Sequence, residues 1–305
     1  MRCIALTPSA RRWLTHTTSA RVLNVFDRAC NLVNQESDLL ALVTSERGLN
    51  PFAMLVDSDD ALPFRNVSTT NAVTVSANHL TVGSLRVEIE LAQEWNPIPD
   101  WPAVRQRLAA ESGWLNVLVE QAMQIAPAGS LLELFNPLSL AWEGFESPMP
   151  VGTLDAGRAP TPLLQRAGQG AIDLVSGLRG GSMEQSMLGA KRLAGLGGGL
   201  TPAGDDFIVG VLLAIWAGLY GSEVLSWCKP IAEATAPLTT TLSAAYLRAA
   251  ARGACMFYWH SLLDALCRKD PADLRLATCD LLSIGHTSGA DALAGFLTHH
   301  LTHRS

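Results

Sequence analysis

The sequence predicts an α+β protein in which a β-rich N-terminal domain (residues 1–102), barrel-like or a sandwich, precedes a larger, mostly helical domain (residues 103–305). Residues 85–91 alternate apolar and charged side chains, which is the period of a half-buried strand. A proline-rich linker at 96–102 then separates this pattern from helical periodicity. Further apolar runs of strand length, bounded by polar turns, occupy residues 39–43, 52–56 and 72–75.

The second domain is read as helical except for one irregular region, where prolines recur from Pro137 to Pro160. Phe207–Tyr220 is apolar on nearly every side, but its fourteen residues fall short of the ~20 needed to cross a bilayer, so a core helix is expected. The predicted helices are 103–124, 163–176, 182–193, 203–220, 223–235, 238–252, 255–268, 272–283 and 289–302.

Composition limits the classes of function. The 305 residues are 48% hydrophobic and 16% charged, and this charged share is below the ~25% typical of soluble domains. This favours buried helices or a subunit interface, including a homo-oligomer. The net charge of −6 argues against nucleic acid or an anionic membrane as the main partner. Six scattered cysteines and the lack of a signal-peptide pattern favour a cytoplasmic protein with reduced thiols.

The most informative stretch begins at Gly195. Four glycines at 195 and 197–199 give a backbone that can adopt positive φ and approach a ligand closely. Thr201 is expected to cap the following helix, with Pro202 as its first residue. A loop leading into a helix N-terminus is a typical anion site, which makes Gly197, Gly198, Gly199 and Thr201 candidate ligands. Ordinary capping is the competing interpretation. No Gly-Lys-Ser/Thr follows, so the loop is not a P-loop.

A second stretch repeats part of this pattern. Gly-x-Asp-x-x-x-Gly occurs at residues 204–210 and again at 289–295. Gly210 and Gly295 each follow an aspartate by four residues and so share its helix face. We expect these small residues to let the two helices approach, with both N-termini at one place. Thr287, Ser288 and Gly289 are therefore further candidate anion ligands.

Titratable residues near these motifs are the candidates for chemistry. Asp206 and Asp291, the pair aligned by the repeat, are candidate catalytic groups, although a first-turn carboxylate also simply complements the helix dipole. Asp205 and Asp206 together form a candidate Mg²⁺ site. His286 lies inside the second motif, where it would donate to an anion or act as an acid.

The helix expected at 238–252 carries two more candidates, Tyr246 and Arg248. Arg248 and Arg252 share a face and could clamp a carboxylate or phosphate. Ion pairing with one of the aspartates, or solvent exposure, is an equally weighted interpretation.

The pair of motifs Gly-Leu-Thr-Pro-x-x-Asp-Asp and Gly-His-Thr-Ser-Gly-Ala-Asp, with Ala-Tyr-Leu-Arg-Ala-Ala-Ala-Arg-Gly between them, resembles the AllH subunit of oxamate carbamoyltransferase. The resemblance is strongest from about residue 195 onward and extends more weakly to 21–32. It implies a subunit of the enzyme that phosphorolyses oxalurate to oxamate and carbamoyl phosphate in anaerobic allantoin degradation, acting on a small anionic substrate together with other subunits. The alternatives are a non-catalytic scaffold subunit, in which the glycines serve helix packing, and a metal-dependent hydrolase.

Overall fold

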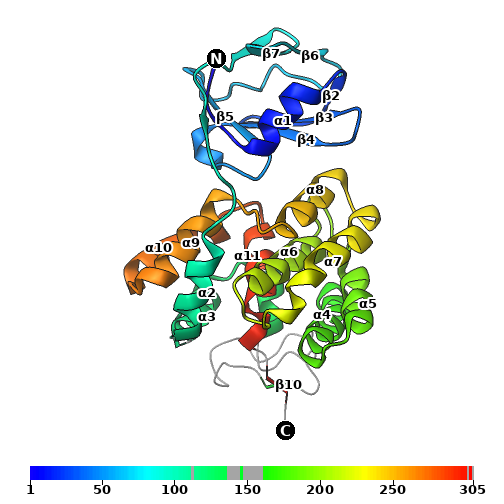
Figure 1. The fold of residues 1–305 in the computed structure, drawn as a ribbon, viewed down its shortest axis with the longest axis vertical. Coiled ribbons are helices and arrows are strands. Elements are labelled where there is room, and N and C mark those ends of the chain that lie inside the picture. The colour runs from blue at the N-terminus through cyan, green and yellow to red at the C-terminus, as the bar shows by residue number, and fades with distance from the viewer. Residues whose placement is uncertain (111–112, 136–144, 147–160, 301, 304–305) are drawn as a thin grey trace. The chain divides into compact units, whose positions relative to one another are not determined.

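The computed structural model describes the chain apart from residues 111–112, 136–144, 147–160, 301 and 304–305 (Figure 1). It divides into two units, Met1–Pro99 with Ala254–Phe257, and Asp100–Gly253 with Tyr258–Ser305. The predicted boundary after residue 102 therefore differs by three residues. Nothing in the sequence indicates that Ala254–Phe257 belongs with the first unit. In that unit the Cys255 N–H donates to the Pro97 carbonyl at 2.8 Å.

The N-terminal unit is a nine-stranded sheet curled into a nearly closed barrel, which confirms the barrel form of the prediction. The strand order is β2-β3-β4-β5-β1-β8-β7-β6, with β9 paired to β1, and a bridge between Arg21 and Ala72 links the two ends. The strands are β1 (Arg2–Leu6), β2 (Ala20–Phe26), β3 (Ala29–Asn34), β4 (Leu39–Val43), β5 (Ala53–Asp57), β6 (Val73–Val75), β7 (His79–Val82), β8 (Leu85–Glu88) and β9 (Gln93–Glu94).

The apolar runs predicted as strands are β4, β5 and β6, each within one residue, and the alternating run from Leu85 forms β8, which ends at Glu88. One helix, α1 (Pro8–His16), packs on the sheet; a short 3-10 turn, η1 (Ser45–Arg47), follows β4. The Thr7 hydroxyl caps α1 by accepting from Ala10 N–H at 3.1 Å. Trp13 on this helix is buried in the core of the barrel, and its indole N–H donates to a backbone carbonyl at 2.9 Å.

The second unit is helical, as predicted. The expected run from 103 to 124 is two helices, and the proline-rich stretch from Pro137 to Pro160 lies outside the described residues except for Phe145–Glu146 (β10), which pairs with Thr302–His303 (β11). The other elements are α2 (Trp101–Ala110), α3 (Gly113–Ile125), η2 (Leu131–Phe135), α4 (Pro162–Gly180), α5 (Met183–Leu193), α6 (Ala203–Trp216), η4 (Glu223–Trp227), α7 (Cys228–Thr235), η5 (Ala236–Leu238), α8 (Thr241–Ala250), α9 (Phe257–Arg268), α10 (Pro271–Leu282), α11 (Ser288–Leu297) and η6 (Thr298–His300).

Helices α6 and α11 lie side by side in the middle of the helical unit (Figure 1). Ten of the fourteen residues of α6 are buried, so it is the core helix that its composition predicts. No helix among the described residues is long and apolar enough to cross a membrane.

Two glycines set the distance between α6 and α11. A Cβ built on Gly210 would lie 1.8 Å from the Ala292 carbonyl oxygen, and one built on Gly295 would lie 1.9 Å from that of Phe207. Each helix backbone therefore occupies the space where a side chain of the other would stand. Both glycines come from the repeated motif, which confirms the expected helix approach.

Replacing Gly210 with Ala should lower the free energy of unfolding by about 3 kcal/mol, because the methyl group must push two backbones apart. The change is measured by urea denaturation. Gly180→Ala is the matched control: its Cβ would meet nothing within 4 Å, so stability should stay the same or rise slightly. Equal stability of both variants would contradict the close packing.

Candidate functional site

The N-terminal ends of α6 and α11 meet at one place. The Thr201 and Ser288 hydroxyls, which precede α6 and begin α11, are 2.9 Å apart and hydrogen-bonded. At the other end of the pair, the Tyr220 and Thr298 hydroxyls are bonded at 2.6 Å. The helices therefore run parallel, and the glycine loop and the second motif meet as predicted.

The expected Thr201 cap of α6 is wrong. Pro202 is the N-cap of α6, the helix begins at Ala203, and no side chain caps it. Thr201 is not free to cap because its hydroxyl bonds to Ser288 across the two motifs. At α11 the N-cap residue Thr287 makes no side-chain cap bond. Its side chain nevertheless acts on the Asp291 carboxyl, whose pKa it lowers.

The glycine loop has the backbone that its composition predicts. The φ angles of Gly195, Gly197 and Gly199 are 71°, 116° and 89°, in the region that favours glycine. Residues 197–200 are exposed, and within the described chain their amides donate no hydrogen bond. A Cβ on Gly198 would meet nothing within 4 Å, and its φ is not positive. Gly198 is thus a glycine that neither packing nor backbone conformation requires.

Asp205 is held by the protein itself. It is 1% exposed, and its Oδ1 accepts from Gly195 N–H at 2.8 Å while its Oδ2 accepts from the Thr239 hydroxyl. Burial raises the pKa of this carboxyl, and the bonds from Thr239 and Gly195 oppose the rise. Asp205 therefore ties the first residue of the glycine loop to the segment before α8, and both its oxygens are engaged.

Asp206 is in a different situation. Burial raises the pKa of its carboxyl well above the ordinary value, hydrogen bonds from Ser288 and Thr201 lower it, and the charges of Asp291 and Asp205 raise it further. Its Oδ2 is buried and has no hydrogen-bond partner within the described chain. A carboxyl in this environment is protonated more readily than an exposed one.

Asp291 lies across from Asp206 and is 1% exposed. Its Oδ1 accepts from Leu131 N–H at 2.6 Å, so the start of η2 is bonded to α11. Burial raises the pKa of this carboxyl to about 6, while the bonds from Leu131 and Thr287 and the nearby His286 oppose the rise. Its Oδ2, like that of Asp206, is buried with no partner among the described residues.

Of the remaining candidates, His286 is exposed but close enough to act on Asp291. Tyr246 lies near Asp206, and burial, reinforced by the charge of Asp206, raises the pKa of its phenol. Arg248 is exposed. Side chains two positions apart on a helix point about 200° away from each other, so the Arg248 side chain leaves α8 on the side opposite to Tyr246. The structure does not bring Arg248 to the cluster.

Gly289 has a packing role. A Cβ on this residue would lie 1.9 Å from the Leu281 carbonyl oxygen, so the first turn of α11 packs against the end of α10. Its amide donates to the Ile284 carbonyl at 3.2 Å and is not available to a ligand.

Sequence reasoning missed the groups that hold the carboxyls in place. Leu131 is 160 residues from Asp291, and nothing in the chain signals this bond. Thr239 and Thr240 precede α8 and look like ordinary capping residues. Thr240 does cap α8 by accepting from Ser243 N–H, whereas Thr239 bonds to Asp205.

No group of three or more His, Cys, Asp or Glu side chains that could hold a metal occurs in the described part of the chain. Since both Asp205 oxygens already accept hydrogen bonds, a cation at the predicted Asp205–Asp206 site would compete with Gly195 and Thr239. Asp206 and Asp291 keep one unpartnered oxygen each, and these are the oxygens able to receive a ligand's N–H or O–H.

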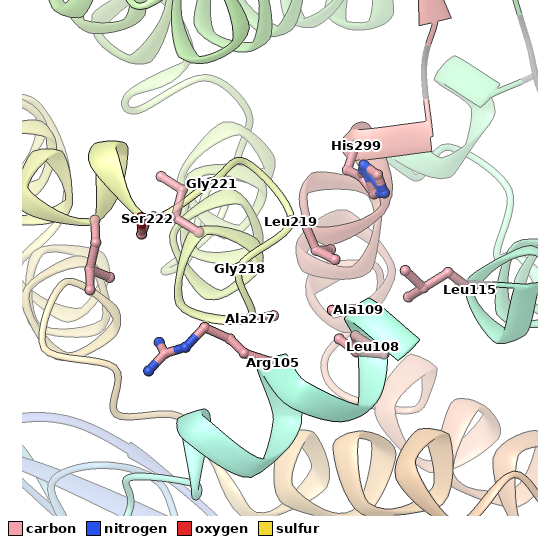
Figure 2. Close-up of a pocket in the computed structure, with 12 residues that line it drawn as sticks. Arg105, Leu108, Ala109, Leu115, Ala217, Gly218, Leu219, Gly221, Ser222 and His299 are labelled. Carbon is pink, nitrogen blue, oxygen red and sulfur yellow. The ribbon is translucent and has the colours of Figure 1, made fainter. Parts of the chain in front are cut away.

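A separate cavity of about 550 Å³ lies at the C-terminal end of α6, about 20 Å along the helix from the aspartates (Figure 2). Its lining is mostly apolar, with Arg105 and His299 as the charged or titratable members. Arg105 already donates to the Trp216 carbonyl at 3.0 Å. This cavity contains none of the residues predicted from the motifs.

The raised pKa of Asp291 has a consequence for stability. Because the folded-state pKa is about 6 and the ordinary value is 3.8, the protonated group stabilises the fold below pH 4, and this contribution is lost as the pH rises through 6. Asp291→Asn keeps the acceptor for Leu131 and removes the ionisation. The stability of this variant relative to wild type should therefore rise by about 1–3 kcal/mol between pH 4 and pH 7, measured by urea denaturation.

Asp270→Asn is the control for this measurement. Hydrogen bonds from the amides of Asp273 and Ala272 lower the pKa of Asp270, so its contribution is present above the ordinary pKa and lost in acid. Because this loss occurs below the ordinary pKa of 3.8, the relative stability of the variant should hardly change between pH 4 and pH 7. A pH-independent difference for Asp291→Asn would contradict the buried, titrating carboxyl.

Two family models match the chain. The model described as the AllH family N-terminal domain matches residues 4–94, which form the barrel, and the model described as oxamate carbamoyltransferase subunit AllH matches residues 193–300. The second match contains the glycine loop, α6, α8 and α11, and with them the whole aspartate cluster. No solved structure matches the chain. The two matches together cover about two thirds of the sequence, and the chain belongs to the AllH family.

Proposed function

We propose that this chain is a subunit of an oxamate carbamoyltransferase complex that converts oxalurate and phosphate into oxamate and carbamoyl phosphate, and that the glycine loop and the aspartate pair form its substrate site. The observation that carries the proposal is the combination, within the described residues, of exposed amides at 197–200 that donate no hydrogen bond and two buried carboxyl oxygens without a partner. The amides can donate hydrogen bonds to an anion, and the carboxyl oxygens can accept a hydrogen bond from an N–H donor.

The reaction moves the carbamoyl group from nitrogen to oxygen. A phosphate oxygen attacks the carbamoyl carbon of oxalurate, a C–O bond forms, the C–N bond breaks, and the leaving nitrogen of oxamate takes up the proton that hydrogen phosphate brought. Catalysis therefore needs groups that hold two anions together, donors for the carbamoyl oxygen, and a path for one proton.

In this proposal, the amides of Gly197, Gly198 and Gly199 hold the phosphate. They are exposed, they point from a loop that precedes a helix N-terminus, and glycine lets the ligand approach the backbone closely. The Thr201 and Ser288 hydroxyls bond to each other and lie beside Asp206, and the one hydrogen that this mutual bond leaves over would donate to the carbamoyl oxygen.

The aspartate pair, Asp206 and Asp291, interacts with the nitrogen atoms of the substrate. Asp206, with its raised pKa, gives its proton to the leaving nitrogen and takes up the proton of hydrogen phosphate in its place, while the second oxygen of Asp291 accepts an N–H from the carbamoyl amide. His286 acts on Asp291 from the solvent side, and Tyr246 borders Asp206. Asp205 fixes the loop and touches no substrate.

A scaffold role is the second candidate, and one observation favours it: Gly204, Gly210, Gly289 and Gly295 are all required by close backbone packing. Packing does not, however, explain Gly198 and Gly199, whose Cβ positions have no protein atom within 4 Å, and Gly198 has no positive φ either. A hydrolase that uses a metal-activated water would instead require Mg²⁺ and would turn over without phosphate.

The proposal places the protein in the cytoplasm, where oxalurate and phosphate are small soluble anions. All six cysteines are free, as expected of a reducing compartment. The chain works with the other subunits of the complex, so activity is to be measured on the assembled enzyme.

Gly198→Ala tests the anion site. The added methyl group meets no protein atom, so the melting temperature should stay within about 2 °C of wild type. It stands where the phosphate would approach the amides, and phosphorolysis by the assembled enzyme should fall at least tenfold, equivalent to about 1.4 kcal/mol. Carbamoyl phosphate formation from oxalurate is the readout.

Gly180→Ala, another glycine with open space around its Cβ but on α4, should leave the rate unchanged. Wild-type activity of Gly198→Ala would remove the loop from the mechanism. Oxalurate breakdown without phosphate, dependent on Mg²⁺, would favour the hydrolase.

A further inference from the structure

Two large apolar side chains are exposed beside the glycine loop. Leu200 is 41% exposed and Leu238 is 51% exposed. The Thr240 hydroxyl donates to the Leu200 carbonyl at 2.6 Å, and the Leu238 carbonyl oxygen lies 2.7 Å from where a Cβ on Gly195 would stand. Both leucines therefore flank the same loop; we call this pair the loop rim. Exposed apolar side chains beside a polar site can form part of a surface that another protein covers.

The site beneath the loop rim is short of positive charge. In the described part of the chain, no Lys or Arg side chain lies within ion-pair distance of Asp205, Asp206 or Asp291. Among the described residues, His286 is a basic group whose charge lowers the pKa of Asp291, and it is exposed. Arg248 leaves α8 on the other side.

This shortage matters for the ligand that the loop would hold. A phosphate dianion beside two carboxyls is repelled unless a cation offsets the charge, and backbone amides supply only partial charges. Enzymes that transfer phosphate-linked groups commonly receive such a cation from a neighbouring chain. The net charge of −6 makes the need for an external cation greater rather than smaller.

We propose that a different subunit of the complex docks on the loop rim and places a Lys or Arg side chain over the glycine loop, where it completes the anion site. The inference rests on the function proposed above. The description of the family as one subunit of a carbamoyltransferase identifies the class of partner. The docking surface of that subunit presents a cation surrounded by aliphatic side chains, which complements a loop edged by leucines and lined by carboxyls.

Leu238→Lys tests the docking. It removes an apolar contact and sets a like charge against the incoming cation, so the dissociation constant for the co-expressed remaining subunits should rise at least tenfold, measured by sedimentation. Leu276→Lys is the matched control: Leu276 is a 64% exposed leucine on α10, and its variant should assemble normally. Both chains should melt at the wild-type temperature, because neither side chain is buried.

A second readout tests the cation. By calorimetry, the assembled complex should bind carbamoyl phosphate at least tenfold more tightly than the isolated chain, and this gain should be lost with Leu238→Lys. Assembly of Leu238→Lys with wild-type affinity overturns the proposal. Equal affinity of the isolated chain and the complex, with or without Mg²⁺, overturns it as well.

The two proposals fail in different ways. Lost activity in Gly198→Ala alongside normal assembly of Leu238→Lys would overturn the docking and leave the anion site in place. Full activity of Gly198→Ala would overturn both.

Discussion

The site depends on the backbone contact between α6 and α11. With Gly210 and Gly295 each facing a carbonyl oxygen of the other helix, the two axes come closer than side chains would allow. The helices run parallel, so this contact also brings their N-termini together and sets Asp206 beside Asp291. A longer separation would leave each aspartate as an ordinary first-turn carboxylate. The same glycines therefore determine both the packing of the core and the chemistry of the cluster.

Two effects oppose each other at the aspartates. The positive ends of two helices favour ionised carboxylates, by ~0.3–1 kcal/mol for an exposed group. Burial of both groups, with the charges of Asp291 and Asp205 added at Asp206, favours the protonated form, and the raised pKa of both groups indicates that these effects prevail. Among the described residues each of these two carboxyls has one buried oxygen without a partner, which costs stability, and such groups occur at catalytic sites or where water or an ion completes the hydrogen bonds. Asp205, the residue directly before Asp206, has a protein partner for each oxygen and is an example of a purely structural carboxyl.

Much of this arrangement is visible in the sequence because it depends on local pattern. The repeated Gly-x-Asp-x-x-x-Gly predicts a shared helix face, and the glycine-rich stretch predicts positive φ; both are found. The sequence does not predict the partners that come from far along the chain, because no period or spacing relates them to the aspartates. These partners are Leu131 for Asp291 and Thr239 for Asp205. The capping prediction was wrong for a similar reason. The Thr201 hydroxyl is hydrogen-bonded to Ser288, which is distant in sequence, and does not bond to an amide in the first turn of its own helix. In the barrel, short apolar runs located β4 to β6, whereas β1 to β3 mix polar and apolar residues and went unpredicted.

The central claim is that Asp206 and its partner serve a ligand rather than the fold, and activity of the assembled enzyme carrying Asp206→Asn tests it most directly. Asn is nearly isosteric and removes the burial of an ionisable group, so the folded chain should be at least as stable as wild type at neutral pH. If the carboxyl passes a proton to the leaving nitrogen, oxalurate phosphorolysis should nevertheless fall by two orders of magnitude or more, about 3 kcal/mol of transition-state stabilisation. Turnover near the wild-type rate in this stable variant would contradict the account.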